Sequence, residues 1–150
     1  MSNSYDNLRI ENQLCFPLYA CAKEITKRYK TVLDKVDLTY TQYICMMVLW
    51  EHGKLNVKEI GKVLFLDSGT LTPVLKKLET KGYIKRERAK ADERNLIVEL
   101  TEKGKKLKEK VKNVPEEVGK CVNLSKEEVA ILYKTLYKIL DTFKDDYEEN

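Results

Sequence analysis

The segment from Phe65 to Gly104 constrains the fold of this chain more than any other part of its sequence. Its first part carries apolar residues at helical spacing, and Gly82 then provides a stop signal for a helix. Two short β-type runs follow, separated by a polar and charged turn, which predicts a basic hairpin. An exposed helix face beside a basic hairpin is typical of small proteins that read duplex DNA, so the segment predicts a DNA-binding unit.

The helix expected over Ser68–Lys81 has one apolar face and one polar face. Its apolar residues follow the i, i+3, i+4, i+7 pattern and are expected to face the core: Leu71, Val74, Leu75 and Leu78. The opposite side is expected to contact DNA through Ser68, Gly69, Thr70, Thr72, Pro73, Lys76 and Lys77. Because Pro73 cannot donate a hydrogen bond to Gly69, a helix that begins at Pro73 with Thr72 as its cap stays open as an alternative.

The hairpin is expected to extend beside this helix, with strands over Tyr83–Arg88 and Leu96–Leu100. Arg94 in its turn would enter the narrow minor groove, where the negative potential of DNA is strongest. Asp92 stands two residues earlier and would orient Arg94 through a salt bridge, and Arg86 is a further candidate for DNA contact. Thr101 is expected to cap the next helix.

Positive charge is concentrated in the same region. The whole chain has a net charge of +4, but residues 76–110 hold 13 Lys or Arg against 7 Asp or Glu, a net +6 that leaves −2 for the rest. This distribution suits the binding of phosphate groups, although a solvated lysine surface would look the same from charge alone.

The remaining helices predict an interface between two copies of the chain. A helix expected over Glu11–Asp34 carries a long apolar stripe, and Pro17 should kink it or delay its start. Capping boxes at Thr39, Asn56 and Ser125 mark further helix starts. Because the terminal stripes are too long for so small a core, we expect them to form a helical dimer interface.

The predicted architecture is mainly α with a small β-hairpin wing, arranged as a winged helix-turn-helix between dimerisation helices. Residues 1–150 would form one subunit, with the DNA-binding region over 38–100 and the helical dimerisation region over 1–37 and 101–150. The chain has no apolar run of the roughly 18 residues needed to span a membrane and no signal-peptide pattern, so it is expected in the cytoplasm. One histidine and no CxxC pattern argue against a zinc site, and no cofactor is expected.

Cys15 has features of a reactive thiol, because it lies at the edge of the apolar stripe, one turn before Tyr19. A helix start displaced by Pro17 would place Cys15 near free backbone N–H groups, which favour a thiolate. The alternative is a small buried apolar residue, which is what most free cysteines are. Cys21 and Cys45 are expected in the core, whereas Cys121 falls in a polar stretch.

Several segments resemble the MarR family of winged-helix regulators, namely LDSGTLTPVLKKLE, GYIKRER, DERN and LTEKG. NQLCFPLY, KRYK and DLTYTQY are similar to the branch of that family that senses organic hydroperoxides, the OhrR-type repressors. The similarity covers nearly the whole chain and is weakest after about Val111. Pro17 departs from the residues usual in the family, which leaves the shape of the thiol pocket open.

The resemblance implies that Cys15 is the oxidised residue and that Tyr29 and Tyr40 hydrogen-bond its sulfur. Tyr29 lies 14 residues after Cys15 in the sequence, about 21 Å along a helix, so the contact would come from the partner subunit. Members with two cysteines have a resolving cysteine near the position of Cys121, which would trap oxidised Cys15 as an intersubunit disulfide. Members with one cysteine use a small cellular thiol instead, and both possibilities stay open here.

The sequence therefore predicts a homodimeric repressor that binds a pseudo-palindromic duplex and releases it when an organic hydroperoxide oxidises Cys15. Three alternatives stay open. They are a MarR-type regulator released by a small phenolic ligand, a thiol peroxidase, and a nonspecific nucleoid-type DNA-binding protein.

Overall fold

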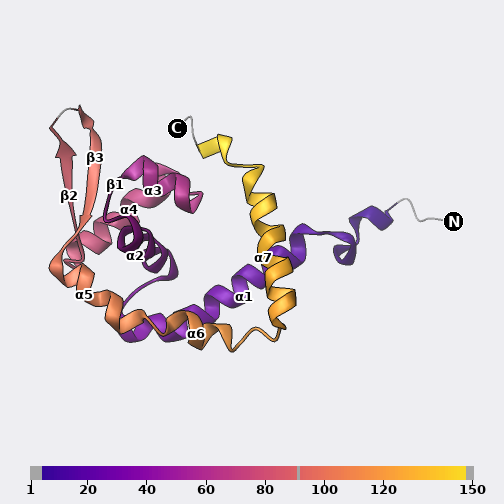
Figure 1. Cartoon of the computed structure of the whole chain (residues 1–150). Helices are drawn as coiled ribbons and strands as arrows, with labels where there is room; N and C mark the ends of the chain where they lie inside the picture. Colours follow the sequence, from indigo (N-terminus) through magenta and orange to yellow (C-terminus); the bar gives the residue numbers. More distant parts are fainter. Residues whose placement is uncertain (1–4, 91, 148–150) are drawn as a thin grey trace.

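The computed structural model describes residues 5–90 and 92–147, without the side chains of residues 93 and 94. Within these residues the helices form a crescent, with α1 along its base and the helix-turn-helix and α7 on opposite sides (Figure 1). The helices are α1 (Cys15–Leu33), α2 (Tyr40–His52), α3 (Val57–Leu64), α4 (Ser68–Thr80), α5 (Glu102–Val111), α6 (Val114–Gly119) and α7 (Lys126–Asp141). Short 3-10 turns precede α1 at Asp6–Leu8 and Ile10–Asn12, link α1 to α2 at Asp34–Val36, and follow α7 at Asp145–Tyr147.

The predicted helix starts are confirmed by their caps. The side chains of Thr39, Asn56 and Ser125 each accept a hydrogen bond from the backbone three residues later, and the Gln or Glu at that position bonds back to the cap. Thr101 caps α5 in the same way through the N–H of Gly104. Local sequence thus determines where each of these helices begins.

The helix α4 runs through Pro73, so the alternative start at that residue is wrong. Its cap is Asp67, whose carboxylate accepts a hydrogen bond from the Thr70 N–H. Leu71, Leu75 and Leu78 are fully buried, as predicted, and pack with α2 and α3. This packing offsets the cost of a proline inside a helix, about 3 kcal/mol, which includes the lost hydrogen bond to Gly69.

The strands form a three-stranded antiparallel sheet in the order β1-β3-β2, with β1 at Lys54–Asn56, β2 at Ile84–Ala89 and β3 at Asp92–Leu100. The hairpin of β2 and β3 projects as the wing (Figure 1). It differs from the prediction because β3 begins at Asp92, which shortens the turn, and because β1 pairs with its base. Val98 on β3 is fully buried.

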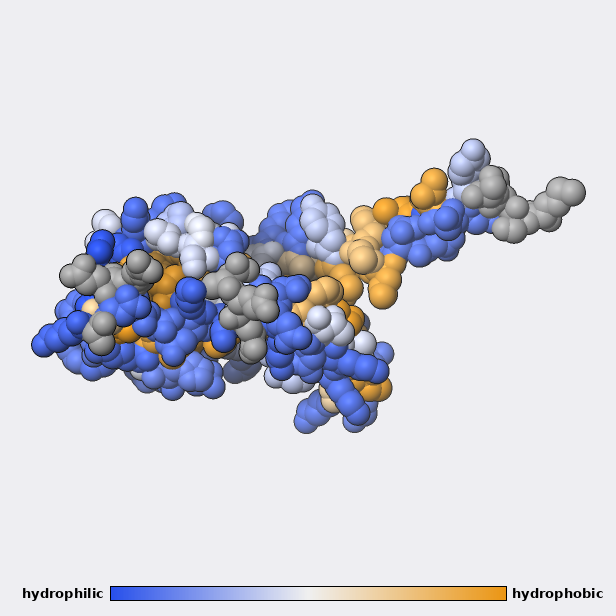
Figure 2. Space-filling view, turned by 90° about the horizontal axis from the view of Figure 1, so that it is seen from above, coloured by the Kyte–Doolittle hydropathy of each residue, from blue (hydrophilic) through white to orange (hydrophobic). Residues whose placement is uncertain are grey.

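The outer helices cover little of their apolar surface within one chain. No residue of α7 is buried, and five of its large apolar residues are exposed, namely Val129, Ile131, Leu132, Tyr133 and Tyr137. The start of α1 is similar, and its hydrophobic side chains form part of a projecting arm (Figure 2). Exposed apolar faces of this extent are typical of protein interfaces, as expected for a helical dimer. Among the described residues, no helix has the length and apolar character needed to cross a membrane.

Candidate DNA-binding and thiol sites

The outer face of α4 presents small and basic side chains. Ser68, Gly69, Pro73, Lys76 and Lys77 are exposed. Neither lysine forms an ion pair with another described residue, so both ammonium groups are available to an anionic partner. The face thus combines close approach at Gly69 with two positive charges about two turns further along the helix.

The two threonines of this face are oriented by bonds within α4. The Thr70 hydroxyl donates to the Asp67 carboxylate at 2.8 Å, and the Thr72 hydroxyl donates to the Ser68 carbonyl at 2.7 Å. The hydrogen bonds from Thr70 lower the pKa of Asp67. Each threonine oxygen keeps lone pairs for a donor on DNA, so the fixed rotamers present acceptors at defined positions.

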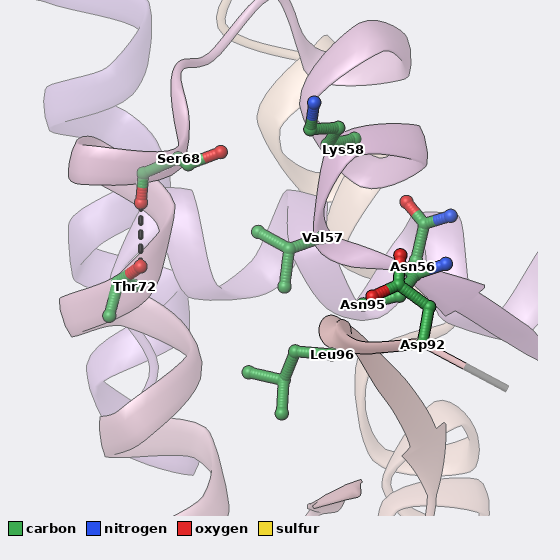
Figure 3. A pocket seen from close by; sticks show the side chains of 8 residues that line it. All are labelled: Asn56, Val57, Lys58, Ser68, Thr72, Asp92, Asn95 and Leu96. Atoms are coloured by element: carbon green, nitrogen blue, oxygen red, sulfur yellow. Dashed lines mark hydrogen bonds between the residues drawn. The ribbon is translucent and has the colours of Figure 1, made fainter. Parts of the chain in front are cut away.

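A cavity of about 480 Å³ separates α4 from the wing. Figure 3 shows Ser68 and Thr72 on one side of it, Asn56, Asp92 and Asn95 on the other, and Val57 and Leu96 between them. Lys58 at the start of α3 completes the lining and is exposed. The candidate DNA-binding residues of α4 and of the wing therefore share one polar depression.

Arg86, a candidate for DNA contact, is paired with Glu79 within the chain. Its guanidinium donates to the Glu79 carboxylate at 3.0 and 2.6 Å, its backbone N–H donates to the same group at 3.1 Å, and its side chain is only 15% exposed. The hydrogen bond from Arg86 lowers the pKa of Glu79. These bonds hold β2 against α4, and the expected DNA contact of Arg86 stays a prediction. The Arg94 side chain and its expected salt bridge with Asp92 lie outside the described residues.

Cys15 is the first residue of α1 and is exposed. Pro17 occupies the third position, where its missing N–H removes no helical bond, so the expected delay of the helix start is confirmed. Leu14 precedes the helix and gives no side-chain cap, so the first-turn N–H groups remain beside Cys15. Tyr19 lies one turn further and is 65% exposed. The Cys15 sulfur is therefore open to a solute at the start of α1.

The predicted thiol-pocket tyrosines lie together at the other end of α1. The rings of Tyr29 and Tyr40 are 4.8 Å apart between centroids, and those of Tyr29 and Tyr43 are 5.9 Å apart. Burial raises the pKa of Tyr29 and of Tyr40, and it raises the pKa of Tyr43 to about 12. All three hydroxyls therefore stay protonated at neutral pH and can act as hydrogen-bond donors. Tyr43 is not among the residues predicted from the sequence, although its i+3 spacing from Tyr40 in a helix indicates that the two lie on one face.

Of the other three cysteines, Cys45 is buried, whereas Cys21 and Cys121 are exposed. Cys45 is fully buried and burial raises its pKa to about 12, so its place in the core is confirmed. Cys21 is exposed, which corrects its expected core position, because none of the described residues covers that face of α1. Cys121 is exposed after α6 and lines a cavity of about 140 Å³ with Glu24, Ile25 and Arg28. Within the described part of the chain, no cluster of three or more His, Cys, Asp or Glu could hold a metal ion.

Comparison with known proteins gives matches over most of the chain. Residues 27–111 match the family model of the transcriptional regulator SarA/Rot. The organic hydroperoxide resistance transcriptional regulator of Bacillus subtilis is 48% identical over 145 residues, which cover 95% of this chain and 97% of that protein. The regulator SarZ of Staphylococcus aureus is 45% identical over 131 residues, which cover 87% and 88%.

Solved structures give the same result. AbfR of Staphylococcus epidermidis is 34% identical with a TM-score of 0.73, over 93% of this chain and 97% of that one. A cysteine-to-serine mutant of Escherichia coli MarR in complex with operator DNA is 27% identical with a TM-score of 0.75, over 93% and 99%.

Proposed function

The chain belongs to the MarR-type winged-helix transcriptional regulators, in the branch of the organic hydroperoxide and SarA/Rot regulators, and we propose that it is a thiol-switched, DNA-binding repressor. It is not an enzyme, since this family comprises transcription regulators. We place it in the cytoplasm, where its DNA lies and where free thiols persist. In this proposal residues 38–100 form the DNA-binding region, and residues 1–37 and 101–150 form the dimerisation region.

DNA binding would follow the usual geometry of the motif, with α4 in the major groove and α3 crossing the backbone. The exposed face of α4 and the wing lie on either side of one polar cavity, so both can meet the same duplex. AbfR, a structural relative, has been solved in a reduced form bound to DNA. In a dimer, two copies of α4 would reach successive major grooves about 34–36 Å apart and thus require a pseudo-palindrome.

Replacement of Lys76 and Lys77 by alanine is expected to weaken binding to a pseudo-palindromic duplex selected from a random pool. Each substitution should raise Kd about tenfold through loss of a charge-assisted contact. If the lysine contacts a phosphate, its replacement should also reduce the steepness with which log K falls with log salt concentration, by about 0.9. Fluorescence anisotropy at several salt concentrations measures both quantities.

The matched control is the replacement of Lys126 and Lys134 in α7, which are exposed and distant from α4. This pair should leave Kd and the salt slope unchanged. An equal loss of DNA affinity in both pairs of lysine variants would show that net charge, and not the face of α4, determines binding.

One observation carries the proposed switch. The sensor candidate Cys15 lies at the first residue of α1, whereas Tyr29 and Tyr40 stack near its last turns. One straight helix keeps them about 21 Å apart at 1.5 Å per residue, so only a second subunit can bring a tyrosine pair to Cys15. In the dimer, the tyrosine hydroxyls of one subunit would donate hydrogen bonds to the thiolate of the other, with Tyr19 beside it.

The oxidation step needs only the thiolate and the peroxide. The Cys15 sulfur attacks one peroxide oxygen, an S–O bond forms, the O–O bond breaks, and the alkoxide leaves as an alcohol after taking up a proton. The peroxide is thereby reduced and the sulfur becomes a sulfenic acid. A polar sulfenic acid or a disulfide at the subunit interface would reposition the two copies of α4. AbfR has been solved in a disulfide form and, overoxidised, on DNA.

We propose that Cys121 resolves the Cys15 sulfenic acid of the partner subunit, with loss of water. One equivalent of cumene hydroperoxide should therefore give a dimer-sized band on a non-reducing gel. Cys121→Ser should abolish that band and leave a monomer whose intact mass is 16 Da higher, as one added oxygen requires. A dimer-sized band in Cys121→Ser, or its loss in Cys21→Ser instead, would contradict the assignment.

A further inference from the structure

The C-terminal tail, defined here as residues 141–147, contacts the helix-turn-helix of its own chain. The ring of Tyr147 meets the ring of Phe65 edge-on, with centroids 5.5 Å apart and planes at 78°. Figure 1 shows the turn Asp145–Tyr147 on the side of α3, at the opposite end of α7 from its junction with α6. The tail therefore connects α7 to the helix-turn-helix of α3 and α4 by a route separate from α5 and α6.

Phe65 is well placed to receive this contact. It follows the last residue of α3 in a left-handed conformation with φ of 53°, which is uncommon for a residue with a side chain. The turn behind it is tight, since a Cβ at Gly61 would lie 2.5 Å from the Leu66 carbonyl oxygen. Tyr147 closes a small cavity of about 50 Å³ with Lys58, Gly61, Lys62, Leu66, Asp67 and Ser68.

This cavity lies on the surface where DNA phosphates are expected. In a helix-turn-helix the first helix crosses the backbone, and here α3 carries the exposed Lys58 and Lys62. Ser68 begins α4, whose first-turn N–H of Thr70 is already bonded to the Asp67 carboxylate, so Lys58 and Lys62 supply the positive charge of this surface. Tyr147 thus stands among the groups that would bind the phosphates beside the major groove.

The tail brings negative charge to the same place. The last ten residues of the sequence hold five acidic residues and one lysine. Asp145 and Asp146 directly precede Tyr147 and form the turn that contains it. Tyr147 lines the cavity with Lys58 and Lys62, so its contact with Phe65 keeps the acidic turn that contains it on this side of the molecule, where added negative charge disfavours phosphate.

We propose that the C-terminal tail competes with DNA for the phosphate-binding surface of α3 and α4, with Tyr147 as the anchor and the acidic residues as the competing charge. The inference rests on the proposed function, because it assumes that α3 and α4 bind DNA. Duplex DNA would displace Tyr147 from Phe65, and the tail would thereby lower the affinity of the reduced dimer.

The test compares three variants of the full-length reduced protein by fluorescence anisotropy on the selected duplex. Tyr147→Ala removes the ring contact, and Asp145→Asn with Asp146→Asn removes charge but keeps the ring. Each should lower Kd about fivefold at 50 mM salt, as expected for a loss of exposed electrostatic competition. The difference should shrink at 300 mM salt because such charges are screened. Tyr147→Phe retains the ring and should bind as the wild type does.

A second measurement follows the tail itself. Carboxypeptidase should remove residues beyond Lys144 faster from the wild type when the duplex is present, and equally fast from Tyr147→Ala with or without it. Unchanged Kd in Tyr147→Ala, or protection of the tail by DNA, would overturn the inference while leaving DNA binding intact. If no variant binds any selected duplex, the proposed function fails and this inference fails with it.

Discussion

Replacement of Gly104 by alanine is expected to destabilise the folded chain by about 3 kcal/mol, at the upper end of the cost of overpacking. Gly104 is a buried residue in the first turn of α5, where a Cβ atom would overlap the carbonyl oxygen of Tyr83. The Cβ would also lie 3.3 Å from Leu100. That carbonyl is fixed because it accepts a hydrogen bond from the Thr101 N–H at 3.0 Å, so the backbone has little room to move.

Gly104 also joins the DNA-binding region to the helices of the proposed dimerisation region. The Trp50 indole N–H on α2 donates to the Gly104 carbonyl at 2.9 Å, so a shift of α5 would also break this bond. Gly119→Ala is the matched control, because a Cβ there has no neighbour within 4 Å. Urea unfolding of the reduced protein should show a large decrease in the free energy of unfolding for Gly104→Ala. For Gly119→Ala the same quantity should change by no more than about 1 kcal/mol. Equal stability of the two variants would contradict the packing described here.

Replacement of Cys15 by serine is expected to remove the response to peroxide while leaving DNA binding in place. One equivalent of organic hydroperoxide should weaken wild-type binding to DNA about 100-fold, near the upper end of typical coupling between two sites. Serine has no thiolate to oxidise at neutral pH, so Cys15→Ser should bind with the same Kd before and after peroxide. Anisotropy titrations of both proteins measure the effect.

The chain offers a matched control in Cys21, which is also exposed on α1 but lies away from its N-terminus. Cys21→Ser should respond to peroxide as the wild type does, because the free N–H groups of α1 lie at Cys15. If Cys21→Ser lost the response to peroxide and Cys15→Ser kept it, the sensor would be Cys21 and the proposed role of Cys15 would be wrong.

Local chemistry explains which parts of the fold could be predicted. The capping boxes and the leucines of α4 define helices through contacts a few residues apart, so the sequence predicts their starts and buried faces. The elements β1 and α6 were missed because they have three and six residues and no periodic pattern of that length. The strand β1 exists because β3 pairs with it, which a local pattern cannot reveal.

The candidate sites were harder to predict where pairing or burial depends on distant residues. Arg86 is a candidate DNA contact in a basic hairpin, and its pairing with Glu79 on α4 could not be predicted. Cys21 shares an apolar stripe, yet the part of the chain that the structure describes leaves it exposed on α1. Tyr29 and Tyr40 could be named from their motifs, whereas Tyr43 joined them only through the packing of α1 against α2.

The most direct test of the thiol switch measures DNA release and Cys15 oxidation in the same titration. Wild-type protein on its duplex would receive cumene hydroperoxide in steps from zero to two equivalents per subunit, with anisotropy and peptide mass read at each step. Loss of the free Cys15 thiol and loss of bound DNA should rise together and be complete near one equivalent. Release of DNA while Cys15 remains a free thiol, or full oxidation of Cys15 with DNA still bound, would contradict the proposed switch.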